Sequence, residues 1–204
     1  MARPGKIVCV GRNYREHARE MGNEVPAEPL LFLKPPSCVI ASGAAIELPT
    51  GAGRVDFEGE IGVLVGAPLR KATEGECARA VRAIVAANDV SARDWQKNDG
   101  QWTRAKGSDT FLPMGTESPA PADLSSLTLI TRVNGKERQR ATAADMVFSI
   151  PALLAYITRF ITLEPGDLVL TGTPAGVGPL EPGDVVEVEV VGHSTVRSPV
   201  AAAS

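Results

Sequence analysis

The chain has 204 residues, of which 21 are lysine or arginine and 24 are aspartate or glutamate, with a formal net charge of -3 at pH 7. This length predicts a single domain over residues 1–204, and the interspersed charges exclude a basic surface for nucleic acid or an anionic membrane, which leaves a small molecule as the expected partner. Cys9, Cys38 and Cys77 lack metal-site spacing, and the N-terminal segment is too poor in apolar residues for a signal peptide, so we expect free thiols in a soluble, cytoplasmic protein.

The N-terminal region predicts a strand followed by a short helix. Lys6 to Val10 is a β-branched run, and helix-forming residues lie between Asn13 and Gly22. His17 and Glu20 are three residues apart on this helix and share one face, so the carboxylate can hold one imidazole nitrogen and leave the other free as a base. The alternative is a solvated helical pair with no catalytic role.

The stretch Val55 to Val63, with the sequence VDFEGEIGV, concentrates acidic residues. It follows a proline-rich loop with a short strand (25–36) and two further short strands (38–40 and 45–48). If 55–63 is one strand, its period of two places Asp56, Glu58 and Glu60 on one face and apolar residues on the other. Three adjacent carboxylates repel one another, which favours a bound cation. The alternative is an exposed edge strand whose charges prevent aggregation.

The middle of the chain adds further polar candidates. Glu74 to Val81 predicts an amphipathic helix, and the apolar run 83–87, which fits either a helix or a strand, ends in NDVSARDWQ. Asp89 then either enters the floor of a site or marks a turn, and Arg93 and Gln96 follow closely enough to reach the same cavity. Lys106 lies in RAKGSDTF, which predicts a loop from which the lysine faces an anionic oxygen or simply water.

The last third predicts regular structure with defined turns. Leu127 to Val133 and the Asn-Gly pair that follows predict a hairpin, and Ser149 is an N-cap for the helix IPALLAYITRF. The sequence LEPGD occurs twice, each time as a Pro-Gly turn before a strand. Between the repeats, LTGTPAGVG offers the hydroxyls of Thr171 and Thr173 to a carboxylate, although such a loop needs no function. We expect the tail, 199–204, to be flexible.

The order of several segments resembles the fumarylacetoacetate hydrolase family. These segments are GRNYREHAREM, LLFLKP, VDFEGEIGV, ANDVSARDWQ, AKGSDTF, MVFSIPALLAYIT and LTGTPAGVGPLEPGD. The resemblance covers nearly the whole chain and is strongest to compact single-domain members that act as acylpyruvases or on oxaloacetate. It implies an α+β fold of strongly bent, mixed β-sheets in a roll or sandwich with few short helices, a homodimer, and a lid over residues 13–29.

The resemblance also implies roles for individual residues. The ligands of one Mg²⁺ or Mn²⁺ ion would be Glu58, Glu60 and Asp89. The catalytic residues would be His17, Glu20 and Lys106. The residues that contact the substrate would be Arg12, Arg93, Gln96 and Thr173. Oxygen ligands without a nearby cysteine or histidine also favour a hard cation over zinc. Asp56 shares their face but is not a ligand position in the family.

The function that this set predicts is hydrolysis of a carbon–carbon bond in an acylpyruvate or fumarylpyruvate, releasing pyruvate and a carboxylic acid. Oxaloacetate decarboxylation or tautomerisation and 2-hydroxyhepta-2,4-diene-1,7-dioate isomerisation are alternatives, because they use the same residues. A protein that binds a metal or a keto acid without turnover, and an oligomer with only surface carboxylates, are lower-ranked alternatives.

Overall fold

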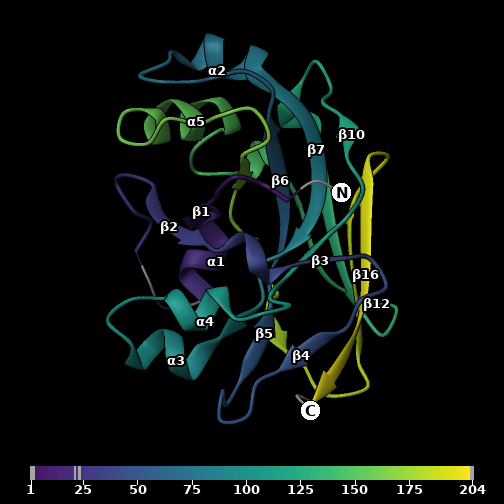
Figure 1. The fold of residues 1–204 in the computed structure, drawn as a ribbon. Coiled ribbons are helices and arrows are strands. Elements are labelled where there is room, and N and C mark those ends of the chain that lie inside the picture. Colours follow the sequence, from purple (N-terminus) through teal and green to yellow (C-terminus); the bar gives the residue numbers. More distant parts are fainter. Residues whose placement is uncertain (1–2, 21, 23, 203–204) are drawn as a thin grey trace.

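The computed structural model describes residues 3–20, 22 and 24–202 and shows a strand-rich molecule with a few short helices (Figure 1). The strands are β1 (Ile7–Gly11), β2 (Leu30–Lys34), β3 (Val39–Ala41), β4 (Ile46–Leu48), β5 (Val55–Phe57), β6 (Gly59–Val65), β7 (Val81–Asn88), β8 (Ser91–Ala92), β9 (Leu112–Met114), β10 (Ser118–Pro119), β11 (Thr128–Val133), β12 (Lys136–Thr142), β13 (Leu168–Leu170), β14 (Gly178–Pro179), β15 (Val185–Val190) and β16 (Ser194–Ala202). The helices are α1 (Arg15–Glu20), α2 (Glu74–Ala80), α3 (Arg93–Asn98), α4 (Thr103–Gly107) and α5 (Ile150–Thr158), with 3-10 turns η1 (Pro36–Cys38), η2 (Leu124–Ser126) and η3 (Ala143–Asp145).

The larger sheet runs through the middle of the molecule. Its strands follow the order β2-β1-β13-β6-β7-β9-β3, with β10 paired to β7. The pairs β1–β13 and β3–β9 are parallel and the other pairs are antiparallel, so the sheet is mixed. The predicted α+β class with mixed sheets is therefore confirmed. Both long central strands, β6 and β7, are buried along almost their whole length.

A second sheet covers one side of the first. It has the order β12-β11-β15-β16-β4, and it packs against β6, β7 and β9 of the larger sheet (Figure 1). The alternation of buried and exposed residues along β15 and β16 fits a sheet with one face against the core and one face outward. The hydrophobic core therefore lies between the two sheets and beneath α2 and α5, which pack together at one end.

Local signals in the sequence explain several element boundaries. Thr73 forms a capping box with Glu76 at the start of α2, and the Ser149 hydroxyl accepts a hydrogen bond from the Ala152 N–H at the start of α5, as predicted. In both LEPGD segments the glycine has a positive φ, +91° at Gly166 and +96° at Gly183, as a type II turn requires. The Asn-Gly hairpin joins β11 and β12 as predicted.

The predicted single strand 55–63 is wrong in one respect. The strand is interrupted at Glu58. The first part, β5, belongs to a small sheet with β8 and β14, whereas the second part, β6, belongs to the large sheet. The cause is a change of partner: the Glu58 N–H donates to the Asn88 side chain, and Gly59 then begins the pairing of β6 with β7. Because every residue from Val55 to Val65 is buried, the exposed-edge alternative is also wrong.

Two other expectations are settled by the fold. The apolar run at 83–87 is part of strand β7, and the loop predicted around Lys106 is helix α4. In the tail, Val200 to Ala202 belong to β16 and pair in parallel with β4, and residues 203 and 204 lie outside the described part, so the flexibility of the tail stays a prediction. The predicted lid also includes residues 21 and 23, which lie outside the described part, so its mobility stays a prediction.

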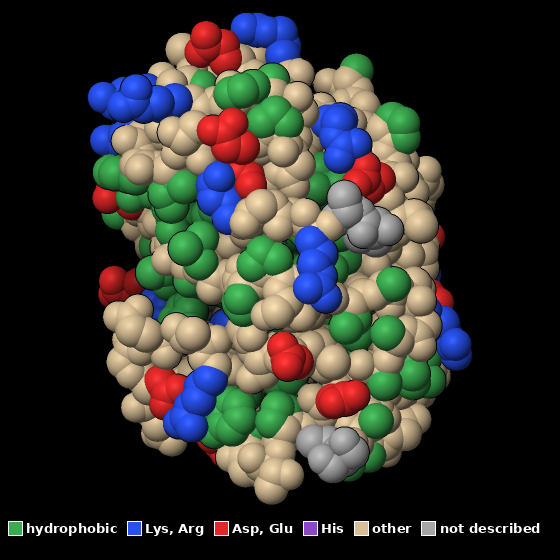
Figure 2. Space-filling model, in the orientation of Figure 1, with side chains coloured by type: hydrophobic (Ala, Val, Ile, Leu, Met, Phe, Trp, Pro, Cys, Tyr) green, Lys and Arg blue, Asp and Glu red, His purple; other side chains and the backbone are tan. Residues whose placement is uncertain are grey.

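The distribution of surface charge and the state of the cysteines agree with the expectations from the composition. On the face shown in Figure 2, basic and acidic side chains are interspersed. Cys9, Cys38 and Cys77 are buried and free. Within the described part of the chain, no helix is long and apolar enough to span a membrane.

Candidate metal centre and its pocket

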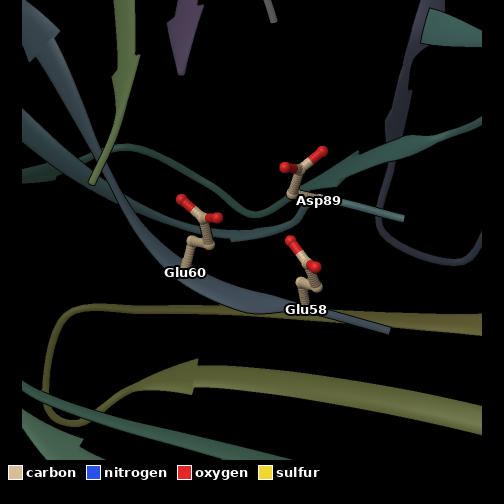
Figure 3. Close-up of side chains that lie close together, drawn as sticks. All are labelled: Glu58, Glu60 and Asp89. Atoms are coloured by element: carbon tan, nitrogen blue, oxygen red, sulfur yellow. The ribbon is translucent and has the colours of Figure 1, made fainter. Parts of the chain in front are cut away.

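Three buried carboxylates meet where the two longest strands of the large sheet run side by side. Gly59 of β6 pairs with Asn88 of β7. Glu58 and Glu60 are the neighbours of Gly59 in the chain and Asp89 is the neighbour of Asn88, so the pairing brings all three carboxylates together. The three side chains lie close together (Figure 3), and one ligand oxygen from each lies within 4.8 Å of the others. Their exposed fractions are 5%, 1% and 0% for Glu58, Glu60 and Asp89. The structure thus brings together the three residues predicted as metal ligands.

Buried cations surround these carboxylates. The ammonium nitrogen of Lys106 lies 2.7 Å from an oxygen of Glu58 and 2.7 Å from an oxygen of Asp89. One nitrogen of Arg93 forms a salt bridge with Glu58 at 2.7 Å, and another donates a hydrogen bond to Asp56 at 2.8 Å. The predicted role of Asp56 outside the ligand set agrees with this geometry, because its two oxygens are held by Arg54 and Arg93.

A third cation, Lys34, was missed by the sequence analysis. Its side chain is fully buried, and its ammonium lies 2.6 Å from the second oxygen of Asp89 and 2.9 Å from the carbonyl oxygen of Phe111. The signal for it was the strand LLFLK, since a period of two puts Phe32 and Lys34 on one face. A lysine ending an apolar strand is usually expected to reach solvent, so this signal was weak.

The protonation of the carboxylates follows from these neighbours. Burial raises the pKa of Glu58, but Lys106 and Arg93 outweigh burial and hold that pKa well below its usual range. Burial also raises the pKa of Glu60, and Asp89 and Glu58 raise it further, so that Glu60 is pushed toward its neutral form. Burial lowers the pKa of Lys106, but Asp89 and Glu58 more than offset this effect, so the ammonium stays charged.

These residues fit a divalent cation of the hard type. The cations Lys34, Arg54, Arg93 and Lys106 pair with Asp56, Glu58 and Asp89, whereas Glu60 forms no salt bridge within the described part of the chain, so a bound cation would compensate its charge. One oxygen of Glu60 accepts the Gly172 N–H at 2.7 Å, and a carboxylate has further lone pairs that a metal can use. An all-oxygen set suits Mg²⁺ or Mn²⁺ rather than zinc.

His17 and Glu20 lie at the edge of the same pocket. The Nδ1 atom of His17 is 3.2 Å from an oxygen of Glu20, and His17 is 6% exposed, so the solvated-pair alternative does not fit the imidazole. Glu20 also accepts the Gly176 N–H at 3.1 and 3.2 Å. The buried Asn13 side chain ties the start of α1 to Thr171 and Phe148. Helix α1 is therefore fixed at both ends.

The pocket has a volume of about 500 Å³ and contains every predicted site residue except Glu20. The predicted substrate contacts that line it are Arg12, Arg93, Gln96 and Thr173. Arg12 has a φ of 59°, a left-handed conformation that is unusual for a side chain of this size. Phe32 and Trp102, which were not predicted, pack edge to face and form an apolar wall. A larger hollow, of about 770 Å³ beside α5, contains none of these residues.

The loop Thr171 to Gly176 holds a carboxylate in a different way from the one expected. The Thr171 hydroxyl donates to the Ile61 carbonyl and the Thr173 hydroxyl donates to the Gly59 carbonyl, so both hydroxyls bind the backbone of β6. The carboxylate that this loop binds is that of Glu60, through the Gly172 N–H. Buried Gln139, also missed from the sequence, links Thr173 to the Gly59 N–H.

Comparison with known proteins gives a consistent result. Residues 6–201 match the family described as fumarylacetoacetate (FAA) hydrolase C-terminal. The oxaloacetate tautomerase YcgM of Escherichia coli is 44% identical over 93% of this chain and 90% of that protein. The 2-hydroxyhepta-2,4-diene-1,7-dioate isomerase structure from Mycobacterium marinum is 42% identical, with a TM-score of 0.90 over 98% of this chain and 75% of that one. Fumarylpyruvate hydrolase from Pseudomonas aeruginosa, solved with Mn²⁺ and pyruvate, is 30% identical, with a TM-score of 0.89 over 97% of this chain and 89% of that one.

Proposed function

Because the chain belongs to the fumarylacetoacetate hydrolase family, we propose that it is a divalent-cation-dependent enzyme that interconverts the keto and enol forms of oxaloacetate. The observation that carries this proposal is the juxtaposition, in one pocket, of a buried carboxylate triad and an imidazole held by a carboxylate. The 44% identity to the Escherichia coli tautomerase supports this substrate over an acylpyruvate. The hydrolase predicted from the sequence becomes the second candidate.

The cation would be held by Glu58, Glu60 and Asp89, whose oxygens converge. When bound there, it would draw electron density from the 2-oxo group and make the neighbouring C–H bond more acidic. The residues of the chain then have to orient the acid and move one proton. The cation would add two positive charges to the cluster, and this addition favours a substrate that carries two carboxylates.

The proton would move through His17. With Nδ1 directed at Glu20, the Nε2 atom is free to take a proton from C3 of oxaloacetate while a C2=C3 double bond forms. Return of that proton to the 2-oxo oxygen gives the enol, so no atom is lost and no further reactant is needed. Glu20 fixes the ring and stabilises its protonated form, and its own contact with the Gly176 N–H limits its movement.

Binding of the two carboxylates would fall to the basic and polar lining. Arg12 enters the pocket from a left-handed backbone position, and Gln96 is oriented by a 2.8 Å contact with Arg93. The ammonium of Lys106 would face the oxygen on which negative charge develops, beside the carboxylates that keep it charged. Phe32 and Trp102 would exclude water from one side of the acid.

A side-by-side assay tests the proposal. Purified protein with Mg²⁺ or Mn²⁺ is given oxaloacetate enol, acetylpyruvate and fumarylpyruvate, and the enol absorbance and pyruvate release are followed. We expect fast loss of the oxaloacetate enol without pyruvate release, and loss of this activity with a chelator. Pyruvate release from the acylpyruvates without any effect on oxaloacetate would refute the tautomerase proposal and support the second candidate.

The second candidate, hydrolysis of an acylpyruvate, is favoured by one feature. The His17–Glu20 pair is also what a general base for a water molecule requires, and the Pseudomonas aeruginosa structure is that of a fumarylpyruvate hydrolase. In this reaction His17 would take a proton from water, whose oxygen forms a bond to the distal carbonyl carbon. The C–C bond beside that carbon then breaks to give a carboxylic acid, and the proton goes to the leaving enolate, which becomes pyruvate. Release of pyruvate from oxaloacetate in the same assay would instead indicate the decarboxylase alternative.

A further inference from the structure

Another hollow, separate from the pocket and from the hollow beside α5, lies against the face of helix α1 that turns away from His17. It has a volume of about 530 Å³, and its basic lining residues are Arg15 and Arg19 of α1 and Arg140 of β12. Residues four apart in a helix share a face, whereas a residue two positions away points to the opposite side. Arg15 and Arg19 therefore face this hollow together, while His17 between them faces the candidate metal centre.

Three arginines and two carboxylates line this hollow, so its basic residues outnumber its acidic ones by one. Among the residues that the structure describes, Arg15 and Arg19 form no salt bridge, and Arg140 pairs with Glu137 through two of its nitrogens. Two acidic residues, Glu16 and Asp145, also line the hollow. Asp145 keeps its negative charge, because the hydrogen bonds that one of its oxygens accepts from the N–H and the hydroxyl of Thr142 lower its pKa, and these bonds direct that oxygen toward η3.

A buried hydroxyl in the wall supplies an independent observation. Tyr14 lines the hollow and is 2% exposed, yet its hydroxyl has no hydrogen-bond partner in the described part of the chain. A buried polar group without a partner usually marks a missing water, ion or ligand. Burial, together with Glu60 and Asp145, raises the pKa of Tyr14, so the hydroxyl remains a donor at neutral pH.

We propose that this hollow is a second, non-catalytic binding site for an oxyanion, the carboxylate or phosphate group of a small metabolite. Arg15 and Arg19 would bind the anion from α1, Arg140 would bind it from β12, and Tyr14 would donate from the wall. Arginine forks and a hydroxyl donor match the oxygens of either group. The site would take its ligand whichever reaction the candidate metal centre catalyses.

Anion binding at this site would affect the mobility of His17 through helix α1. An anion held by both arginines of α1 and by Arg140 ties the helix to β12, and the other side of the same helix carries His17 and Glu20. The hollow and the pocket also share the loop that follows Thr173, since Pro174 and Ala175 line the hollow and Gly176 donates to Glu20. Anion binding would therefore reduce the motion of the segment that holds the imidazole.

Calorimetric titration at low ionic strength tests the site. Metal-free protein is titrated with inorganic phosphate and, separately, with succinate, and the higher affinity identifies the group that the site prefers. We expect binding to wild type and to an Arg70→Gln control, whose arginine is exposed and lies outside this hollow. Binding should be at least about tenfold weaker in the Arg15→Gln/Arg19→Gln double variant, because two charge-assisted contacts are lost.

Two further results decide the proposal. Tyr14→Phe keeps the ring in the core and should weaken anion binding several-fold without loss of folding, and amide exchange in α1 should slow on anion addition in wild type but not in the double variant. No heat with either anion, or equal affinity in wild type and the double variant, would overturn the site. Unchanged exchange in α1 of the wild type would overturn its connection to His17. None of these readouts depends on catalytic activity.

Discussion

At the scale of single residues, burial determines which charges act together. Lys34 and Lys106 are both lysines, the residue type least often buried, yet both have their ammonium groups among carboxylates in the interior. A buried charge is tolerated only when its partners stay in place, so each lysine fixes the position of Asp89 from a different side. Asp89 is thereby positioned before any cation arrives.

Replacing Lys34 by methionine should destabilise the fold more than replacing an exposed arginine. Loss of one partner from a buried ion pair typically costs about 3–5 kcal/mol, and we expect about 3 kcal/mol because Asp89 keeps Lys106. Urea unfolding in the presence of a chelator measures this cost. The matched control is Arg82→Met, whose exposed pair with Glu117 should contribute about 0–1 kcal/mol. Equal losses in the two variants would contradict the structural role of Lys34.

Replacing His17 by glutamine should abolish turnover and leave metal binding intact. General-base assistance raises kcat by about 10²–10⁴-fold. His17 is not one of the three residues whose oxygens converge, so its loss should leave the metal affinity unchanged. Steady-state kinetics gives kcat, and calorimetry with Mg²⁺ gives the metal affinity. His193→Gln is the control, since this other histidine contacts Ser118 and does not line the pocket. A His17→Gln variant with wild-type kcat would remove the imidazole from the mechanism.

At the scale of elements, the junction between β5 and β6 creates the site. The chain leaves one sheet and enters another at Glu58, and the second sheet of the core contacts this junction through Thr131 of β11 and Gln139 of β12. Gly59 is required here because a Cβ atom would lie 1.9 Å from the Thr131 hydroxyl. The close approach of β11 to Gly59 keeps the two neighbouring glutamates close to Asp89.

A Gly59→Ala substitution should therefore destabilise the protein by about 1–3 kcal/mol, the usual cost of overpacking. Combining it with Thr131→Ala, which removes the nearest atom, should recover part of this loss, while the contact with Gln139 at 3.0 Å remains. Thermal or urea unfolding of the single and double variants measures the coupling. Gly178→Ala is the control, because its Cβ atom would meet Phe57 at an ordinary 3.4 Å. Strict additivity of the two substitutions would contradict the clash.

The elements that the sequence predicts well are those with local causes. The Asn-Gly hairpin, the helix that Ser149 caps and the two Pro-Gly turns depend on residues next to one another in the chain. The break at Glu58, the strand at 81–88 and the helix around Lys106 depend instead on distant partners, so spacing alone did not reveal them. The same reason explains the site: the spacing of the carboxylates favoured a cation and the family resemblance supplied the ligand set, but burial of Lys34 appears only once the strands are paired.

At the scale of the whole molecule, stability should depend on pH and on the cation together. The pKa of Glu60 is raised by burial and by two neighbouring carboxylates, so the folded protein favours its protonated form. A carboxyl group whose pKa is raised on folding stabilises the fold fully below its unfolded pKa, about 4.3, and this contribution is lost as the pH rises through the folded pKa. A bound divalent cation favours the ionised form instead.

With a chelator present, the free energy of unfolding should therefore fall as the pH rises above about 4.3 and through the raised pKa of Glu60. At a Mg²⁺ concentration of 100 times its dissociation constant, the protein should gain about 2.7 kcal/mol, and more at higher pH. Urea unfolding at several pH values with and without Mg²⁺ measures both effects. Glu60→Gln should flatten the pH dependence in the chelator series; a slope equal to that of wild type would assign it to another group.

The pairing of the first strands with the last ones has a consequence for synthesis of the protein. Ile7 of β1 pairs with Leu168, and Ile46 of β4 pairs with Val200, so the partners of early segments leave the ribosome only after most of the chain has been translated. Contacts between residues far apart in sequence form slowly, and an unpaired strand is exposed until its neighbour arrives. The nascent polypeptide must therefore stay protected from aggregation until residues 168–202 have been synthesised.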